Sequence, residues 1–121
     1  MAHAADELAS ALEQVADSVD AAASQQRKAA RIARSTARAR RVDGLEEPST
    51  TRSVRQILEL LGRSAELLGG ATAGLRRVWA AALAEEGLSI RQIGERLGVT
   101  HQRVSALLRN HHQAKPADVG R

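Results

Sequence analysis

The feature that most constrains this chain is its first third, because residues 2–43 contain neither Gly nor Pro and are richest in Ala. Ala has the highest helix propensity, whereas Gly and Pro interrupt helices. We therefore expect one helix over residues 2–43, about 60 Å long at about 1.5 Å per residue. A small core does not cover such a helix. It must project, bend near residues 24–26, or pair with another chain.

An apolar stripe runs along this expected helix in alternating steps of four and three residues, which is the spacing of a helix seam. Charge is segregated along the same helix, with acids over residues 6–20 and bases over residues 27–41. This polarity complements the helix dipole, and it would also let two copies lie antiparallel. The simpler alternative is a solvated, charged helix. The stripe consists of Leu8, Leu12, Val15, Val19, Ala22, Gln26, Ala29 and Ala33.

A turn separates this helix from the rest of the chain. Residues 43–50, DGLEEPST, contain Gly44, which can end a helix, and Pro48, which precedes the next one. A hydroxyl side chain among residues 49–51 is expected to cap a second helix that runs to about Leu68. The apolar face predicted for this helix consists of Val54, Ile57, Leu58, Leu61, Ala65 and Leu68.

Two adjacent glycines, Gly69 and Gly70, are expected to break the second helix because glycine is a poor helix former. A third helix should follow over about residues 71–86 and close at Gly87. Its single Trp79 is most simply an anchor of the core. The predicted inner side of the third helix consists of Leu75, Val78, Trp79, Ala82 and Leu83.

Residues 88–110, LSIRQIGERLGVTHQRVSALLRN, predict two short helices joined by a tight turn. Ser89 can cap the first of them, which ends at Leu97. Gly98 supplies the turn, because a sharp break after a helix needs a positive φ that glycine adopts freely. Thr100 can cap the second through its hydroxyl. The predicted buried residues are Ile90, Ile93 and Leu97 in the first helix, and Val104, Leu107 and Leu108 in the second.

This spacing resembles the helix-turn-helix family of DNA-binding proteins in its pairs Ile93–Gly94, Gly98–Val99 and Val104–Leu107. The family more often has Ala where Gly94 stands, although Gly also allows the two helices to touch. The segment LGVTHQRVSALL is similar to the promoter-reading C-terminal domain of bacterial sigma factors and to small bacterial regulators. The resemblance covers residues 73–110, and it implies a DNA-reading unit over residues 71–110 supported by the third helix.

If the resemblance holds, the last helix, residues 101–110, would enter the major groove with its N-terminal end. Its polar side chains suit base edges, and nearby bases and a hydroxyl suit phosphates. The predicted base-reading residues are His101, Gln102, Arg103, Ser105 and Ala106. The predicted phosphate contacts are Thr100, Arg91, Arg76, Arg77 and Arg109. A simpler alternative is a three-helix unit whose polar surface only keeps it in solution.

The sequence thus predicts an all-α chain with four parts: a long charged helix (1–43), a linker with a second amphipathic helix (44–70), a tri-helical DNA-binding unit (71–110), and a disordered tail (111–121). That tail is too short and too polar to form a β-wing. A homodimer through residues 5–68 is expected, because one such unit reads few base pairs. Net charge is +4, which favours a polyanionic partner such as double-stranded DNA.

The basic segment of the first helix can be explained in more than one way. It could lie along DNA phosphates as an arm, or it could hold an acidic protein partner. Two rival functions follow, namely an architectural nucleoid protein of low sequence specificity and a sigma-like protein that binds RNA polymerase or another transcription protein. A viral packaging subunit fits less well, because there the reading motif usually comes first. The arm consists of Arg27, Lys28, Arg31, Arg34 and Arg38.

Other classes of protein are not expected. No nucleophile motif or phosphate-binding glycine loop is present, so the chain is not expected to be an enzyme or to hold a cofactor. His111 and His112 lack the cysteines or organised carboxylates of a metal site. The absence of cysteine and of a long apolar run favours a cytoplasmic protein, located at the bacterial nucleoid and not in a membrane.

Overall fold

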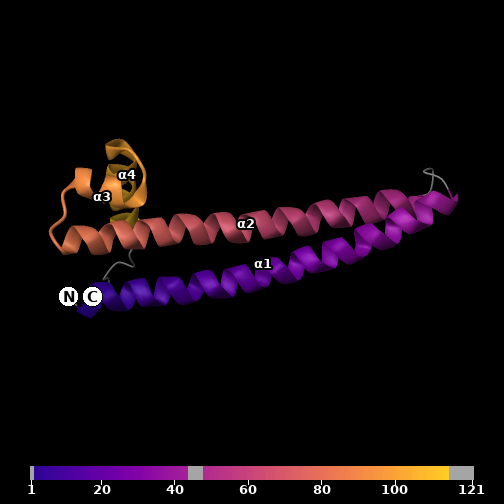
Figure 1. Cartoon of the computed structure of the whole chain (residues 1–121), viewed down its shortest axis with the longest axis horizontal. Helices are drawn as coiled ribbons and strands as arrows, with labels where there is room; N and C mark the ends of the chain where they lie inside the picture. Colours follow the sequence, from indigo (N-terminus) through magenta and orange to yellow (C-terminus); the bar gives the residue numbers. More distant parts are fainter. Residues whose placement is uncertain (1, 44–47, 115–121) are drawn as a thin grey trace. The chain divides into compact units, whose positions relative to one another are not determined.

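The computed structural model describes residues 2–43 and 48–114, in which all regular secondary structure is helical. The helices are α1 (Ala2–Asp43), α2 (Pro48–Glu85), α3 (Ile90–Leu97) and α4 (His101–Ala114), as labelled in Figure 1. The predicted all-α class is confirmed. The chain divides into two compact units, unit 1 with residues 1–15 and 71–121, and unit 2 with residues 16–70. α1 and α2 each contribute to both units.

α1 is continuous over the predicted range and shows no break at residues 24–26. Its buried residues, however, match the predicted stripe only in part. Ala11, Ala22 and Ala29 are buried, whereas Leu12 and Val19 are 50% and 46% exposed. The seam therefore includes residue 11 rather than residue 12, and small side chains there allow another helix to approach closely. Of the predicted stripe, Ala22 and Ala29 are confirmed as buried.

α2 corrects two predictions. It begins at Pro48, so the hydroxyl residues 49–51 lie inside its first turn and do not precede it. Proline suits this first position because its fixed φ is helical and its missing N–H would have no partner there. The helix also continues through Gly69 and Gly70, where a break was predicted. Each glycine costs about 1 kcal/mol relative to Ala, which a long helix that has already nucleated can absorb.

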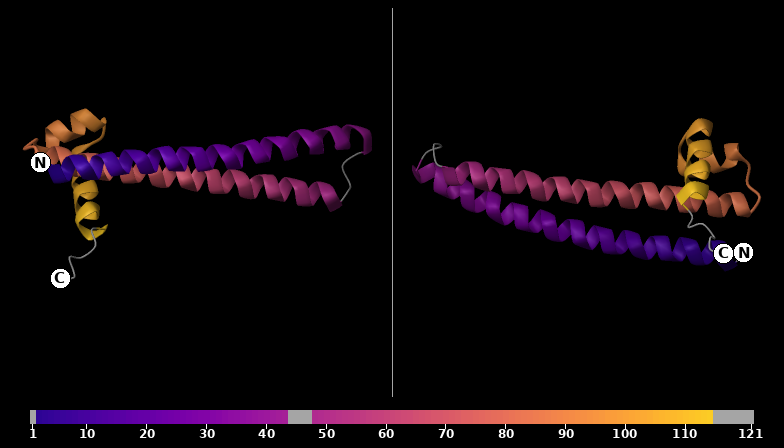
Figure 2. Two further views of the ribbon diagram at one scale, coloured as in Figure 1. Left: turned by 90° about the horizontal axis from the view of Figure 1, so that it is seen from below. Right: turned by 180° about the vertical axis from the view of Figure 1, so that it is seen from behind.

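In unit 2, residues 16–43 of α1 and residues 48–70 of α2 lie side by side and antiparallel (Figures 1 and 2). Leu60 and Ser64 of α2 are buried. The amide Nε2 of Gln26 donates a hydrogen bond of 2.8 Å to the hydroxyl of Ser64. Of the face predicted for this helix, Val54, Leu58, Leu61 and Ala65 are exposed, whereas Ile57 and Leu68 are half-buried. The prediction of that face as buried was therefore wrong for most of its residues.

In unit 1, the end of α2 packs with α3 and α4 around a core of five buried residues. Ile93 and Val104 are fully buried at its centre. Trp79 packs against this core, as predicted, but Ile90 is 43% exposed and its predicted burial was wrong. The first helix also reaches this unit, since the Glu7 carboxylate lies 3.8 Å from Nε2 of His111 in α4. The five core residues are Ala80, Leu83, Ile93, Val104 and Leu107.

Candidate nucleic-acid interface

The connection between α2 and α3 is closed by a capping box. Gly87 turns the chain with φ of 95°. Ser89 then caps α3, as predicted, because its hydroxyl accepts a hydrogen bond of 3.1 Å from the backbone N–H of Gln92. The Gln92 side chain accepts in return from the backbone N–H of Ser89, at 2.8 Å. Two backbone donors that have no partner within the helix are thereby satisfied.

The turn between α3 and α4 depends on two glycines. Gly98 has φ of 74°, in the left-handed region that was predicted for it. The backbone N–H groups of Gly98 and Val99 both donate to the carbonyl of Gly94, at 2.7 Å and 3.0 Å. A Cβ placed on Gly94 would lie 2.8 Å from the carbonyl oxygen of Val99. Gly94 thus gives the turn room to fold back against α3, and this contact fixes the direction in which α4 leaves.

α4 begins with the cap that the sequence predicted. The Thr100 hydroxyl accepts a hydrogen bond of 3.2 Å from the backbone N–H of Arg103. The Thr100 carbonyl accepts the first helical bond of α4, from Val104 at 3.0 Å. Because the hydroxyl acts as an acceptor here, its own hydrogen is free for a further acceptor. The first turn of α4 is therefore held in place by local bonds together with the burial of Val104.

The predicted base-reading residues lie in the first two turns of α4, and Gln102 and Ala106 among them lie on its outer side. His101, Gln102 and Arg103 are exposed in the first turn, and Ser105 and Ala106 are half-buried in the next. Gln102, Ala106 and Arg109 share one face, since they are spaced by four and three residues. That face is opposite the buried side formed by Val104, Leu107 and the half-buried Leu108. α4 continues to Ala114, beyond residue 110 where helix was predicted to end, and residues 115–121 lie outside the described chain.

The side chains predicted to contact phosphates differ in their exposure to solvent. Thr100, Arg91, Arg76 and Arg109 are exposed. Arg77 is half-buried, and its Nε is enclosed with no hydrogen-bond partner within the described residues. An enclosed guanidinium reaches a backbone phosphate less readily than an exposed one. Of the four arginines predicted to contact phosphates, Arg91, Arg76 and Arg109 are therefore the better placed to do so.

The predicted basic arm lies on α1 within unit 2. Arg27, Lys28, Arg31, Arg34 and Arg38 are all exposed. No acidic side chain interrupts them between residues 21 and 42. The arm and the base-reading candidates of α4 belong to different units. Each group is therefore a candidate DNA contact in its own right.

Two residues of the interface region are absent from the sequence prediction. Gln92 completes the capping box, and the order Ser-x-x-Gln at residues 89–92 is the signal that could have indicated it. Arg96 is an exposed base in the last turn of α3, close in the chain to the Gly98 turn. Its signal is weak, because a single exposed arginine on a helix is common.

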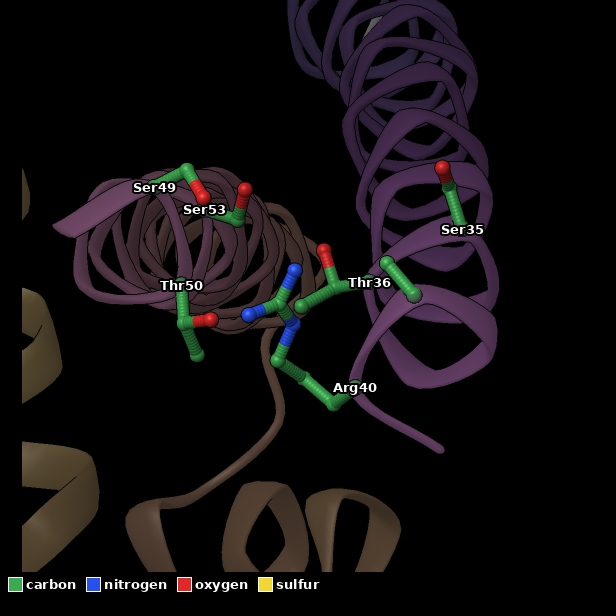
Figure 3. A pocket seen from close by; sticks show the side chains of 7 residues that line it. Ser35, Thr36, Arg40, Ser49, Thr50 and Ser53 are labelled. Atoms are coloured by element: carbon green, nitrogen blue, oxygen red, sulfur yellow. The ribbon is translucent and has the colours of Figure 1, made fainter. Parts of the chain in front are cut away.

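A polar cavity of about 120 Å³ lies in unit 2. Figure 3 shows the Arg40 guanidinium between Thr36 of α1 and Thr50 of α2. A space of this size has room for about four water molecules at about 30 Å³ each, and it is too small for an organic cofactor. The residues around it are Ser35, Thr36, Ala39, Arg40, Ser49, Thr50 and Ser53.

Residues 2–43 and 48–114 lack two other kinds of site. No cluster of three or more His, Cys, Asp or Glu side chains there could hold a metal ion. None of the helices in the same ranges combines the length and the apolar character that a membrane span needs. Comparisons of the chain with protein-family models, curated proteins and solved structures found no match.

Proposed function

We propose that this chain is a sequence-specific, double-stranded DNA-binding protein that acts as a homodimeric bacterial transcription regulator at the nucleoid. The observation that carries the proposal is the two-sided character of α4. Its inner side, with Val104 and Leu107, is buried in the core of unit 1. Its outer side carries exposed Gln102, and His101 and Arg103 flank that residue as exposed side chains of the same first turn, directly after the turn at Gly98. A helix held in this way can insert its first turns into a groove without unfolding.

The outer side chains match the chemistry of the major groove, which is wide enough for an α-helix. Gln102 can bond in a bidentate manner to adenine, and Arg103 can do so to guanine. Ala106 is small enough to lie against a thymine methyl group. His101 and Ser105 can each donate or accept a hydrogen bond.

Contacts with phosphates would set the position of α4 on the duplex. The Thr100 hydroxyl can donate to a phosphate oxygen while it caps α4, because the N–H of Arg103 occupies only its acceptor side. Arg91, Arg76 and Arg109 are exposed and can pair with phosphates on either side of the groove. The net charge of +4 favours the approach to DNA.

The first test is selection of binding sites from a randomised duplex library at physiological salt, where non-specific complexes are weak. We expect an enriched motif with two-fold symmetry. Gln102→Ala should lower discrimination at one position of each half-site by about 1–3 kcal/mol, measured by fluorescence anisotropy with matched and mismatched duplexes. Gln14→Ala, at an exposed glutamine of α1, is the control and should leave the motif unchanged. Recovery of DNA without any motif would reject sequence-specific recognition.

The second candidate function is an architectural DNA-binding protein, and the uninterrupted basic arm of α1 favours it. In that case, Arg31, Arg34 and Arg38 would pair with phosphates directly. Replacing all three with Gln would weaken binding equally at every sequence. The slope of log K against log salt would become shallower by about 0.9 for each phosphate that the variant leaves without a cation. Unchanged affinity and salt dependence in this variant would reject the arm as a DNA-binding element.

A third candidate is a protein that binds RNA polymerase or another component of the transcription machinery. The acids of α1, which precede all of its bases, favour contact with a basic protein surface. Capture of polymerase from nuclease-treated lysate, together with no binding to any duplex, would replace the DNA-binding proposal with this one.

A further inference from the structure

Unit 2 carries an apolar face that nothing in the described chain covers. In α2, the side chains of Val54, Leu58 and Leu61 are 44%, 64% and 46% exposed. In α1, Val19 is 46% exposed. These residues are in addition to the seam at Leu60, Ala22 and Ala29, which already joins α1 to α2. α2 therefore has two apolar stripes, of which only one is used within the chain, and Val19 of α1 is a further exposed apolar residue of unit 2.

Val19 and the exposed stripe of α2 lie on the same side of the helix pair. Each is displaced from the seam of its own helix by about a third of a turn in the same rotational sense, at about 3.6 residues per turn. Because the helices run antiparallel, equal rotation brings both to one side. The hydrogen bond from Gln26 to Ser64 supports this arrangement, since Gln26 belongs to the same α1 stripe as Val19 and reaches across to α2. The result is one broad apolar face with a contribution from each helix.

The surface of α2 on this face also leaves room for another helix. A shallow hollow of about 370 Å³ lies there, lined by Thr50, Thr51, Val54, Arg55 and Leu58. Gly62 and Gly69 follow Leu58 and Leu61 around the same side of α2, and a Cβ added to either glycine would meet nothing within 4 Å. Internal packing thus gives no reason for these two glycines, although glycine is unfavourable inside a helix. The close approach of another backbone would give one.

The charges beside the apolar face suggest that the occupant is a second copy of the chain. Asp20, Arg27 and Arg34 follow each other at intervals of seven residues, so they form one row along α1 next to the Val19 stripe. In an antiparallel pair of identical helices, a row of this kind faces itself in reverse order. With Arg27 at the midpoint, Asp20 of one copy meets Arg34 of the other, twice in each dimer. The long Arg27 side chains at the centre are exposed and can turn toward solvent.

We infer that two copies of the chain pack through this face as an antiparallel four-helix bundle, with α1 on α1 and α2 on α2. The apolar core of the interface is Val19, Val54, Leu58 and Leu61, and the Asp20–Arg34 pairs set its direction. This inference specifies the dimer that the proposed function calls for. Its tests need no DNA, so the dimer and the DNA-binding function can fail independently.

The first test is the mass of the full chain in solution by sedimentation equilibrium at micromolar concentration. We expect twice the chain mass of 12.9 kDa. Leu58→Glu should raise the dimer dissociation constant at least a hundredfold, because it places a charge in the apolar interface. Gln56→Glu is the matched control, since Gln56 is exposed on α2 and lies on the side away from Val54, Leu58 and Leu61. It should leave the dissociation constant within a factor of three, and circular dichroism should show that both variants remain helical.

The second test concerns direction. Asp20→Arg should weaken the dimer at least tenfold, and adding Arg34→Asp in the same chain should restore most of the affinity. The chain has no cysteine, so Arg27→Cys, at the midpoint, should form a disulfide with its own copy under mild oxidation. Arg34→Cys, in the same row but seven residues from the midpoint, should not, whereas a parallel pair would cross-link at both positions. A monomeric wild-type chain, or a dimer that Leu58→Glu leaves intact, would overturn the interface. Failure of the charge swap, or cross-linking at Arg34→Cys as readily as at Arg27→Cys, would overturn the antiparallel arrangement.

Discussion

Gly94 shows how a single residue governs the geometry of the candidate interface. Its carbonyl accepts the N–H groups of both Gly98 and Val99, and its missing side chain leaves room for the Val99 carbonyl. In this chain, a Cβ there would lie only 2.8 Å from a backbone oxygen. A backbone atom cannot move aside as a flexible side chain can, so the turn itself would have to shift.

Gly94→Ala should therefore destabilise the chain by about 1–3 kcal/mol, the usual cost of overpacking a close contact. Urea unfolding followed by circular dichroism measures this change. Gly74→Ala is the matched control, because a Cβ at Gly74 meets nothing within 4 Å. It should be neutral or stabilising by up to about 1 kcal/mol, since Ala is the better helix former. Equal effects of the two substitutions would show that the contact with Val99 has no energetic weight.

At the scale of a helix, α4 depends on its cap for the arrangement of its first turn. Thr100→Ala removes the acceptor for the Arg103 N–H and should cost about 1 kcal/mol of stability. Thr100→Ser keeps the hydroxyl and should retain most of that stability. Hydrogen exchange of the Arg103 amide measures the local effect, which should be faster exchange in the alanine variant alone. An unchanged exchange rate in that variant would contradict a capping role.

The helices also show which features of the fold could be predicted from the sequence. The extent of α1, the caps at Ser89 and Thr100, and the left-handed Gly98 were predictable, because each depends on local chemistry. The buried face of α2 was not. Val54, Leu58 and Leu61 are as apolar as Leu60, so periodicity alone cannot decide which stripe faces α1. That choice depends on a partner helix far away in sequence, whose seam consists of small alanines.

In the candidate site, too, only the features that depend on local chemistry could be predicted from the sequence. Exposure of Gln102 followed from the burial of Val104 and Leu107 on the opposite side of α4. The half-buried state of Arg77 and of Ser105 did not follow, because it depends on how neighbouring helices cross. Continuation through Gly69 and Gly70 was also missed, since glycine lowers helix stability without preventing the helical conformation.

For the molecule as a whole, pairing of two copies through the uncovered face of unit 2 would make the unfolding temperature depend on protein concentration. If two copies pack together when folded and separate when unfolded, mass action raises the unfolding temperature as protein concentration rises. We expect a clear rise in Tm across a hundredfold range of concentration in scanning calorimetry. Leu58→Glu should remove this dependence, whereas Gln56→Glu should preserve it. A wild-type Tm that is independent of concentration would contradict a dimer coupled to folding.

The hydrogen bond between Gln26 and Ser64 has a consequence for how the chain finds its fold. The buried α1 residues of unit 2, Ala22 and Ala29, are seven residues apart and present the same surface, so they give α2 little basis for choosing between alignments shifted by seven residues. In such a shifted alignment, Ser64, which is 2% exposed, would face Val19 or Ala33 in place of Gln26 and would have no polar partner there. This one polar pair therefore selects the register of α1 against α2. Helix pairs in a shifted register would lose the hydrogen bond during folding, although the alanines of the seam would tolerate the shift.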